Sequence, residues 1–278
     1  MKLEQFWDGI NLADKHREAL LQMCFEPREC EKLYKLYDKN HDDFFKEVLK
    51  KPESSLWFLW LYSHMACKVY GKYEEAGISE RVFWDTFQDI RLWCENAEKE
   101  FGIPGLMEYE WFYRHIDMVL FRFGRIQFEK MTEEDSLLPI IRNIEENYPV
   151  VCNGKIDGEK VIFIHIPQGE PLIWEECQKS LDIAKSFFGK DNTYVCHSWL
   201  LYPGLDAVLS ETSNIREFRK NFKIIQTDYK EREAEWRIFG KVLKNVVDYP
   251  EETGLQKRVK EYLLGGNVLG NGLGILVI

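Results

Sequence analysis

The apolar residues of the first hundred positions recur at helical spacing. After Ser79, apolar side chains return every three or four positions until Gly102 and Pro104 interrupt the pattern. The face that they form consists of Phe83, Phe87, Ile90, Cys94, Ala97 and Phe101. Such spacing places side chains along one side of a helix, and serine is a favoured N-cap residue. The pattern therefore predicts an amphipathic helix that begins after Ser79 and buries this face.

Polar hinges divide the rest of this region into further helical stretches. They lie near Pro27 and at positions 39–42, 51–55 and 77–79. A cluster of two glycines and a proline follows at 102–105, and such clusters are typical of turns and linkers. We therefore predict a helical bundle over residues 1–104 and a second domain over residues 105–278.

The most apolar window of the chain runs from Leu56 to Tyr70. A helix that crosses a membrane needs about 20 predominantly apolar residues. This window is shorter and contains His64 and Lys68. It therefore predicts a helix buried in the core of the bundle rather than a membrane span.

Strand-like patterns begin after position 120. The segment RFGRIQFE, at 122–129, predicts one strand, in which Gly124 indicates a bulge or the close approach of another backbone. Further on, the dipeptides Asn153-Gly154 and Asp157-Gly158 are typical of tight turns between antiparallel strands. The second domain is therefore expected to contain a sheet with antiparallel neighbours.

An alternation of strands and helices follows from residue 161. The segment VIFIHIP, at 161–167, has apolar side chains on both faces, as expected of a strand in the centre of a sheet. The loop Gln168-Gly169-Glu170 then leads into an amphipathic helix that ends at Gly189. The strands TYVCHSWLLYP (193–203) and KIIQTDY (223–229) lie on either side of the run SNIREFRKNF. The predicted order is strand, loop, helix, strand, helix, strand.

The loop before this helix has the features of an anion site. A helix N-terminus leaves backbone N–H groups without partners and carries partial positive charge, so phosphate oxygens find donors there. Gly169 allows a close approach of the backbone. A strand, a loop with one glycine and a helix also occur in any α/β protein, so the pattern alone leaves an ordinary structural connection as the alternative.

Alternating glycines in the C-terminal tail, GGNVLGNGLGILVI, have a structural explanation. A dinucleotide-binding fingerprint follows a strand and opens a helix, whereas this run follows the helical segment LQKRVKEYLL. We therefore expect the glycines to cap that helix and to let the last strand turn or bulge.

Composition narrows the functional classes. The 278 residues are 45% hydrophobic and 14% aromatic, enough for substantial cores. Acidic residues exceed basic ones by ten (47 − 37), which argues against a nucleic-acid or membrane-surface partner. The seven cysteines form no CxxC pair and the histidines are widely separated, so we expect reduced thiols and no metal. The charged N-terminus lacks a secretory signal pattern, and a cytoplasmic protein is expected.

Several phrases of the chain resemble a known group of proteins. In order, they are RFGRIQFE, HIPQGEPL, SWLLYPGL, SNIREF, EWRIFG and the tail LQKRVKEYLLGGNVLGNGLG. They are similar to a bacterial family that joins a helical N-acyltransferase N-terminal domain to a GNAT-like C-terminal domain. The resemblance implies an α+β protein, in which a helical N-terminal bundle packs on a GNAT-like mixed β-sheet domain.

The resemblance also implies a cofactor site. In the GNAT superfamily, the strand before the first loop supplies a backbone donor, and the loop and its helix cradle the pyrophosphate of coenzyme A. A later helix commonly begins with asparagine and carries an aromatic residue four positions on. Carried over to this chain, the cofactor-binding residues are Ile166, Gln168, Gly169, Leu172, Asn214 and Phe218.

Two departures from the superfamily pattern bear on activity. The superfamily loop has two alternating glycines, whereas this loop has one, followed by Glu170. Phe218 stands where many members have a tyrosine that protonates the departing thiolate. Phenylalanine has no proton to donate, so an acid must come from elsewhere or the thiolate leaves unaided, as thiols with pKa values near 8.5 allow.

Acyl transfer from a thioester to an amine needs a base, donors for the carbonyl oxygen and orientation of the reactants. His165 is the candidate base, because imidazole changes its charge near neutral pH and this strand lies beside the expected thioester. His197 and Ser198 are candidates for relaying a proton or binding the acceptor. A satisfied core histidine and ordinary strand packing are the structural alternatives for these residues.

These observations predict an N-acyltransferase that moves an acyl group from acetyl-CoA or another acyl-CoA to the amine of a small molecule or peptide. The alternative is a non-catalytic GNAT-like module that binds a ligand or a protein through a degenerate cofactor site. Binding of acyl-CoA and release of the coenzyme A thiol distinguish the two.

Overall fold

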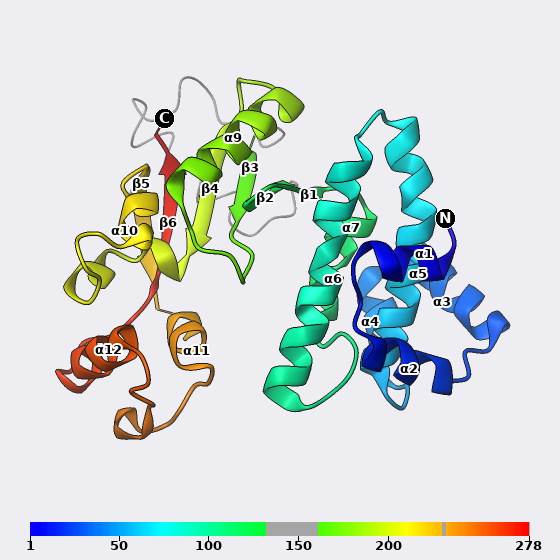
Figure 1. Ribbon diagram of the computed structural model, residues 1–278, viewed down its shortest axis with the longest axis horizontal. Coiled ribbons are helices and arrows are strands. Elements are labelled where there is room, and N and C mark those ends of the chain that lie inside the picture. The colour runs from blue at the N-terminus through cyan, green and yellow to red at the C-terminus, as the bar shows by residue number, and fades with distance from the viewer. Residues whose placement is uncertain (132–160, 230–231, 278) are drawn as a thin grey trace. The chain divides into compact units, whose positions relative to one another are not determined.

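The computed structural model describes residues 1–131, 161–229 and 232–277. The chain divides into two compact units, Met1–Phe123 and Gly124–Ile278 (Figure 1). Unit 1 is predominantly helical, whereas unit 2 contains a mixed sheet with helices. The predicted α+β class is confirmed. The turns predicted at 153–158 lie outside the described residues.

Unit 1 contains a series of helices separated by short breaks. They are α1 (Leu3–Gly9), α2 (Asp14–Gln22), α3 (Pro27–Lys39), α4 (His41–Leu49), α5 (Ser54–Glu75), α6 (Glu80–Phe101) and α7 (Tyr113–Ile116), with a 3-10 turn at Tyr109–Trp111 and strand β1 (Leu120–Phe123) at the end. The breaks before α3, α4, α5 and α6 coincide with the polar hinges of the sequence, whereas the break between α1 and α2 was not predicted. Pro27 occupies the first turn of α3, where its missing N–H removes no helical hydrogen bond.

Helices α5 and α6 form much of the buried interior of unit 1. The apolar window from Leu56 to Tyr70 lies within α5 and is largely buried, as predicted. In α6, Ser79 Oγ accepts a hydrogen bond from the Val82 N–H at 3.4 Å, which confirms the predicted N-cap. The prediction for Phe101 is wrong, because this side chain is 57% exposed. It is the last residue of α6, and the chain turns at Gly102 one turn beyond the last buried residue of the face.

Unit 2 is built around a mixed sheet. Its strands are β2 (Ile126–Lys130), β3 (Val161–His165), β4 (Thr193–Ser198), β5 (Phe222–Asp228) and β6 (Asn271–Leu276), and its α-helices are α9 (Trp174–Phe188), α10 (Asn214–Arg219), α11 (Glu233–Phe239) and α12 (Gly254–Leu264). The described strands of this unit are neighbours in the order β2-β3-β4-β6-β5. The β3–β4 pair is parallel and the other pairs are antiparallel. The predicted order of strand, loop, helix, strand, helix, strand is confirmed by β3, α9, β4, α10 and β5.

Two strand predictions need correction. The segment RFGRIQFE is not one strand, because a turn at Gly124-Arg125 separates β1 from β2. Gly124 has φ 64°, a conformation that glycine adopts easily, so it marks this turn and not a bulge. The strand predicted at 193–203 ends at Ser198, whose Oγ accepts from the Leu200 N–H at 3.2 Å and caps a 3-10 turn at Trp199–Leu201.

The C-terminal glycines make room for neighbouring backbone. Gly265 follows α12 as its C-cap, as predicted. Strand β6 lies between β4 and β5, and a Cβ atom on Gly272 would lie 2.5 Å from the carbonyl oxygen of Leu201. The predicted bulge in the last strand is instead a register shift on its neighbour β5, between Ile224 and Gln226. The alternating glycines of β6 therefore let the 3-10 turn after β4 lie directly against the strand.

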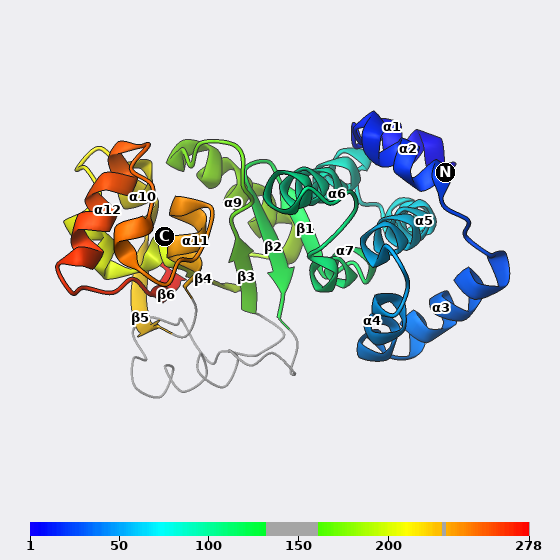
Figure 2. The ribbon, with the colours of Figure 1, turned by 90° about the horizontal axis from the view of Figure 1, so that it is seen from below.

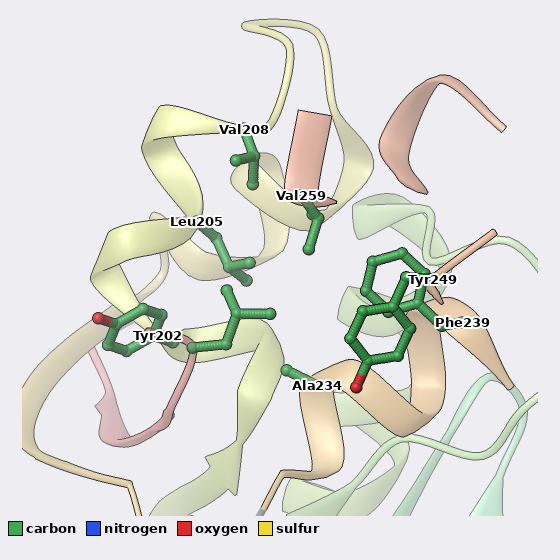
Figure 3. Packing of buried hydrophobic residues seen from close by; sticks show 8 residues of the cluster. Tyr202, Leu205, Val208, Ala234, Phe239, Tyr249 and Val259 are labelled. Carbon is green, nitrogen blue, oxygen red and sulfur yellow. The ribbon is translucent and has the colours of Figure 1, made fainter. Parts of the chain in front are cut away.

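An apolar cluster joins the segments that follow β4 and β5. Figure 2 shows two of its helices, α11 and α12, next to each other, and these helices are in contact. The cluster consists of Tyr202, Leu205, Val208, Ala234, Phe239, Tyr249, Val259 and Leu269 (Figure 3). The rings of Phe239 and Tyr249 stack with centroids 4.0 Å apart. The Tyr249 hydroxyl also donates to Glu235 Oε2 at 2.5 Å, so the polar end of this ring is satisfied.

Candidate functional site

The parallel strands β3 and β4 are paired over only part of their length. Their register joins Val161 to Thr193, Ile162 to Tyr194 and Phe163 to Val195. Both strands then continue, but β3 pairs with β2 at His165, and β4 pairs with β6 up to Ser198. Within the described residues, the ladder between β3 and β4 therefore ends at Phe163 and Val195, next to the predicted loop.

His165 and His197 occupy equivalent positions beyond the end of this ladder. Each lies two residues after a member of the last pair, Phe163 and Val195. Side chains alternate between the faces of a sheet, and directly paired residues share a face. The two imidazoles therefore lie on the same face of the sheet, one on each side of the place where the strands stop pairing.

Each of these histidines is hydrogen-bonded to a carboxylate on a different strand. His165 Nε2 lies 2.7 Å from Glu129 Oε2 on β2, and His197 Nε2 lies 2.6 Å from Asp228 Oδ2 on β5. The imidazoles retain side-chain exposures of 22% and 25%. A carboxylate in this position orients an imidazole and stabilises the imidazolium that forms when it accepts a proton. The arrangement can perform general acid–base chemistry on a group that approaches this face.

Ser198 does not share this face. It is paired with Gly272 on β6, whereas His197 is paired with Leu273, so the two side chains point to opposite faces of the sheet. Its Oγ serves the cap of the following 3-10 turn. The structure therefore places His165 and His197 on a common face and Ser198 on the other.

Asn271 adds a further polar group to the face that carries the histidines. It is paired with Asp228 across β5 and β6, so the two side chains share a face. Its side chain is 1% exposed, and among the described residues its Oδ1 atom has no hydrogen-bond partner. Nothing in the sequence distinguishes this asparagine from the turn residues around it. Only its pairing with Asp228 shows that it lies on the face of the histidines.

The predicted phosphate loop lies between β3 and α9. Gln168, Gly169 and Glu170 are exposed, and Gly169 has φ 109° with no heavy atom within 4 Å of the point where a Cβ atom would stand. Ile166 is half-buried and Leu172 is buried. The backbone of the loop is therefore exposed at Gly169, and the buried side chain of Leu172 anchors the end of the loop to the core.

Helix α9 begins at Trp174 without a side-chain cap. Its N-cap residue, Ile173, makes no side-chain hydrogen bond to the first turn. The first N–H groups of a helix have no partner within the helix, so this N-terminus offers donors and partial positive charge to an anion. Glu175 and Glu176 lie in the same turn and oppose an anion, and both side chains are exposed.

An arginine that the sequence analysis missed holds this loop. Arg125, in the turn between β1 and β2, is only 7% exposed. Its guanidinium donates to the carbonyl oxygens of Pro167 at 3.0 Å, Glu170 at 2.7 Å and Pro171 at 3.0 Å. These partners lie more than 40 residues further along the chain. No local pattern indicates such a contact.

The other predicted cofactor residues lie at and near the start of α10. Asn214 is the exposed first residue of α10, and Ser213 caps the helix through a hydrogen bond from the Ile215 N–H at 3.3 Å. Phe218 is fully buried, and its ring meets Trp174 of α9 edge to face with centroids 6.0 Å apart. Phe218 therefore links α10 to the first residue of α9.

The buried cysteines of this unit are unsuited to nucleophilic catalysis. Burial raises the pKa of the Cys177 thiol on α9 to about 11, because the thiolate would lose its hydration. Burial also raises the pKa of Cys196 on β4 well above its usual range. Both thiols are therefore protonated at neutral pH and are not thiolate nucleophiles.

The fold and the family comparisons agree. The fold is that of a GNAT-like acyltransferase: a mixed sheet in which a loop and a helix connect the two parallel strands. The family model "GNAT-like C-terminal domain" matches residues 120–276, which is more than half of the chain, and "N-acyltransferase N-terminal domain" matches residues 1–118. The chain belongs to this two-domain acyltransferase family.

Solved structures with the same fold are distant in sequence. An acyltransferase in complex with decanoyl-CoA and teicoplanin shares 17% identity and a TM-score of 0.76, covering 98% of this chain and 86% of its own. The structures of an acyltransferase with CoA and 10C-teicoplanin, and with decanoyl-CoA, give the same identity and TM-score over 99% of this chain and 87% of theirs. No curated protein matches the sequence. The structural similarity therefore establishes the fold.

Neither a membrane helix nor a metal cluster is found among the described residues. None of the helices there has both the length and the apolar character that a membrane crossing requires. No group of three or more metal-ligating side chains is close enough in this part of the chain to hold an ion.

Proposed function

We propose that this protein is an N-acyltransferase that moves an acyl group from an acyl-CoA to an amine. The observation that carries the proposal is the end of the β3–β4 ladder between two histidine–carboxylate pairs, His165–Glu129 and His197–Asp228. An exposed loop with Gly169 and the uncapped N-terminus of α9 follow β3. Membership of the acyltransferase family supports this assignment.

The donor in this proposal is acetyl-CoA or a longer acyl-CoA. The loop residues Gln168 and Gly169 and the anchoring Leu172 hold the diphosphate, and the Ile166 backbone approaches the thioester. Asn214 and Phe218 line the same site from α10. Since related acyltransferase structures contain decanoyl-CoA, acyl chains of about that length belong among the donors to be tested.

The proposed reaction assigns the base to His165. The amine nitrogen attacks the thioester carbonyl carbon, a C–N bond forms, and the amine proton passes to the imidazole, whose positive charge Glu129 stabilises. The C–S bond then breaks and the coenzyme A thiolate leaves. Phe218 cannot protonate it, but thiolates are stable enough leaving groups to depart without an acid.

The acceptor in this proposal is an amine of a small molecule or a peptide. His197, paired with Asp228, lies across the end of the ladder from His165 and is placed to bind this amine or to relay its proton. Teicoplanin is bound in one of the related structures, which makes a large acceptor worth testing beside small amines. Ser198 lies on the opposite face and its Oγ caps the following 3-10 turn, so this proposal gives it no role in binding the acceptor.

A second candidate function is a binding module without catalysis. The absence of a hydroxyl on the buried Phe218 and the single glycine of the loop favour it, because both differ from the superfamily pattern. This module would bind an acyl-CoA or a protein but would release no coenzyme A when an amine is added.

Thermal denaturation with donor ligands tests the proposed cofactor. At a ligand concentration of 100 times Kd, binding to the folded state alone stabilises it by about 2.7 kcal/mol. For a unit of this size, each kcal/mol raises the melting temperature by about 2–4 °C. We expect acetyl-, octanoyl- or decanoyl-CoA to raise the melting temperature by several degrees, and pantetheine, which lacks the diphosphate, to raise it less.

Two results would contradict the proposal. If no acyl-CoA changes the melting temperature, acyl-CoA is not the donor of this protein. A raised melting temperature, without release of coenzyme A thiol when a panel of primary amines is added, would favour the binding module.

A further inference from the structure

The buried guanidinium of Arg125 fixes the orientation of the loop backbone. Three of its hydrogen bonds go to main-chain oxygens: Pro167 O, Glu170 O and Pro171 O. The three carbonyls therefore point toward Arg125. A planar guanidinium presents its donors in a fixed fork, so it holds the three oxygens in one geometry, which a lysine with a single ammonium cannot reproduce.

The orientation of these carbonyls determines where the neighbouring amides point. In a trans peptide the C=O and the following N–H point in opposite directions, and the described chain contains no cis peptide. Because Pro167 O and Pro171 O face Arg125, the N–H groups of Gln168 and Leu172 point away from it. The clamp thus turns two amide donors toward the side of the loop that is opposite the guanidinium.

The clamp is itself anchored to helix α9. The backbone N–H of Arg125 donates to Ser180 Oγ at 3.0 Å, and this hydroxyl donates to the carbonyl oxygen of Glu176 at 2.9 Å. Ser180 is buried in the middle of α9. The same arginine therefore connects the loop before α9 to the body of α9, so the loop amides and the helix N-terminus are held as one unit.

We propose that Arg125 is the positioning residue of the coenzyme A diphosphate site. It compensates for the second glycine that the loop lacks, because it fixes the backbone by hydrogen bonds where other loops rely on glycine. It also directs the Glu170 carbonyl inward while the Glu170 side chain remains exposed. This inference rests on the proposed function, since it names the residue that prepares the loop for an acyl-CoA diphosphate.

Comparison of two acyl donors tests this role. Octanoyl-CoA carries the diphosphate, whereas the octanoyl thioester of N-acetylcysteamine does not. We expect Arg125→Lys and Arg125→Gln to raise the KM for octanoyl-CoA by about 10-fold to 100-fold, in line with the loss of charge-assisted hydrogen bonds. Turnover of the N-acetylcysteamine thioester should stay within about twofold of the wild type, because that donor makes no contact with the loop through a diphosphate.

A matched variant controls for the general effect of removing a buried arginine. Arg219 in α10 also donates to a backbone carbonyl, Tyr202 O at 3.0 Å, and forms an ion pair with Asp206. Arg219→Gln should leave the ratio of the two donors' kcat/KM values unchanged. Melting temperatures of all variants are measured in the same buffer. If Arg125→Gln does not fold, Arg125→Lys, which retains the positive charge, provides the test.

Two outcomes would overturn the inference. A KM for octanoyl-CoA that is unchanged in both Arg125 variants would mean that the loop does not need the clamp. An equal loss with both donors would mean that Arg125 supports only the stability of the fold. A wild-type protein that uses neither donor would instead refute the proposed function, which separates that failure from a failure of the clamp.

Discussion

Replacing His165 by glutamine is expected to lower the turnover of acyl-CoA and amine by about 100-fold or more at neutral pH. Glutamine keeps a polar group near Glu129 but cannot accept the proton of the attacking amine. Because His165 retains a hydrogen bond of 2.7 Å to Glu129, Glu129→Gln should also lower turnover, by weakening the stabilisation of the imidazolium. Release of coenzyme A thiol measures both effects.

The controls for this experiment separate catalysis from folding. His41→Gln removes another carboxylate-paired histidine, one that lies 3.4 Å from Asp117 in unit 1, and should leave turnover unchanged. Added imidazole should restore part of the activity of His165→Ala, since the site is partly exposed. If His197→Gln alone loses turnover while His165→Gln remains active, the base is assigned wrongly and belongs to the His197–Asp228 pair.

A methyl group added at Gly272 is expected to destabilise unit 2 strongly. A Cβ atom there would lie 2.5 Å from Leu201 O and 2.7 Å from Leu201 C, both backbone atoms that cannot rotate away. Overpacking of this kind typically costs about 1–3 kcal/mol and occasionally more. We expect Gly272→Ala to lower the melting temperature by about 2–4 °C for each kcal/mol lost.

Gly71→Ala is the matched control for this substitution. Gly71 lies inside helix α5, and a Cβ atom there would meet nothing within 4 Å. Alanine is favoured over glycine in a helix by about 0.5–1 kcal/mol, so this variant should be slightly more stable than the wild type. Equal melting temperatures for the two alanine variants would show that the 3-10 turn moves aside and that the glycine is not required.

Helix boundaries were the part of the fold most accessible from sequence. Ser79 and Gly102, a cap residue and a glycine, delimit α6 as predicted because their effects are local. Strand limits were less accessible. The turn at Gly124-Arg125 and the 3-10 turn after Ser198 interrupt apolar runs that read as continuous strands, and an apolar run alone does not distinguish a strand from a strand followed by a tight turn.

Only part of the candidate site could be predicted from the sequence. His165 and His197 were identified because they lie on predicted strands, the loop at Gly169 because it follows one, and the phrases around them resemble a known family. Their partners were not. Glu129, Asp228 and Arg125 lie on other strands or turns, 31 to 46 residues away from the groups that they contact. Such pairings depend on which strands are neighbours and in which register.

The sequence by itself determined the two-part α+β organisation, the helices of unit 1 and the strand–loop–helix order of unit 2, because helical spacing, caps and glycines act within a few residues. Only the tertiary structure decided that two histidines share one face at the end of the β3–β4 ladder, that each has a carboxylate partner, and that one buried arginine holds the loop. These features arise from strand register and from the long reach of a guanidinium, and neither leaves a periodic pattern along the chain.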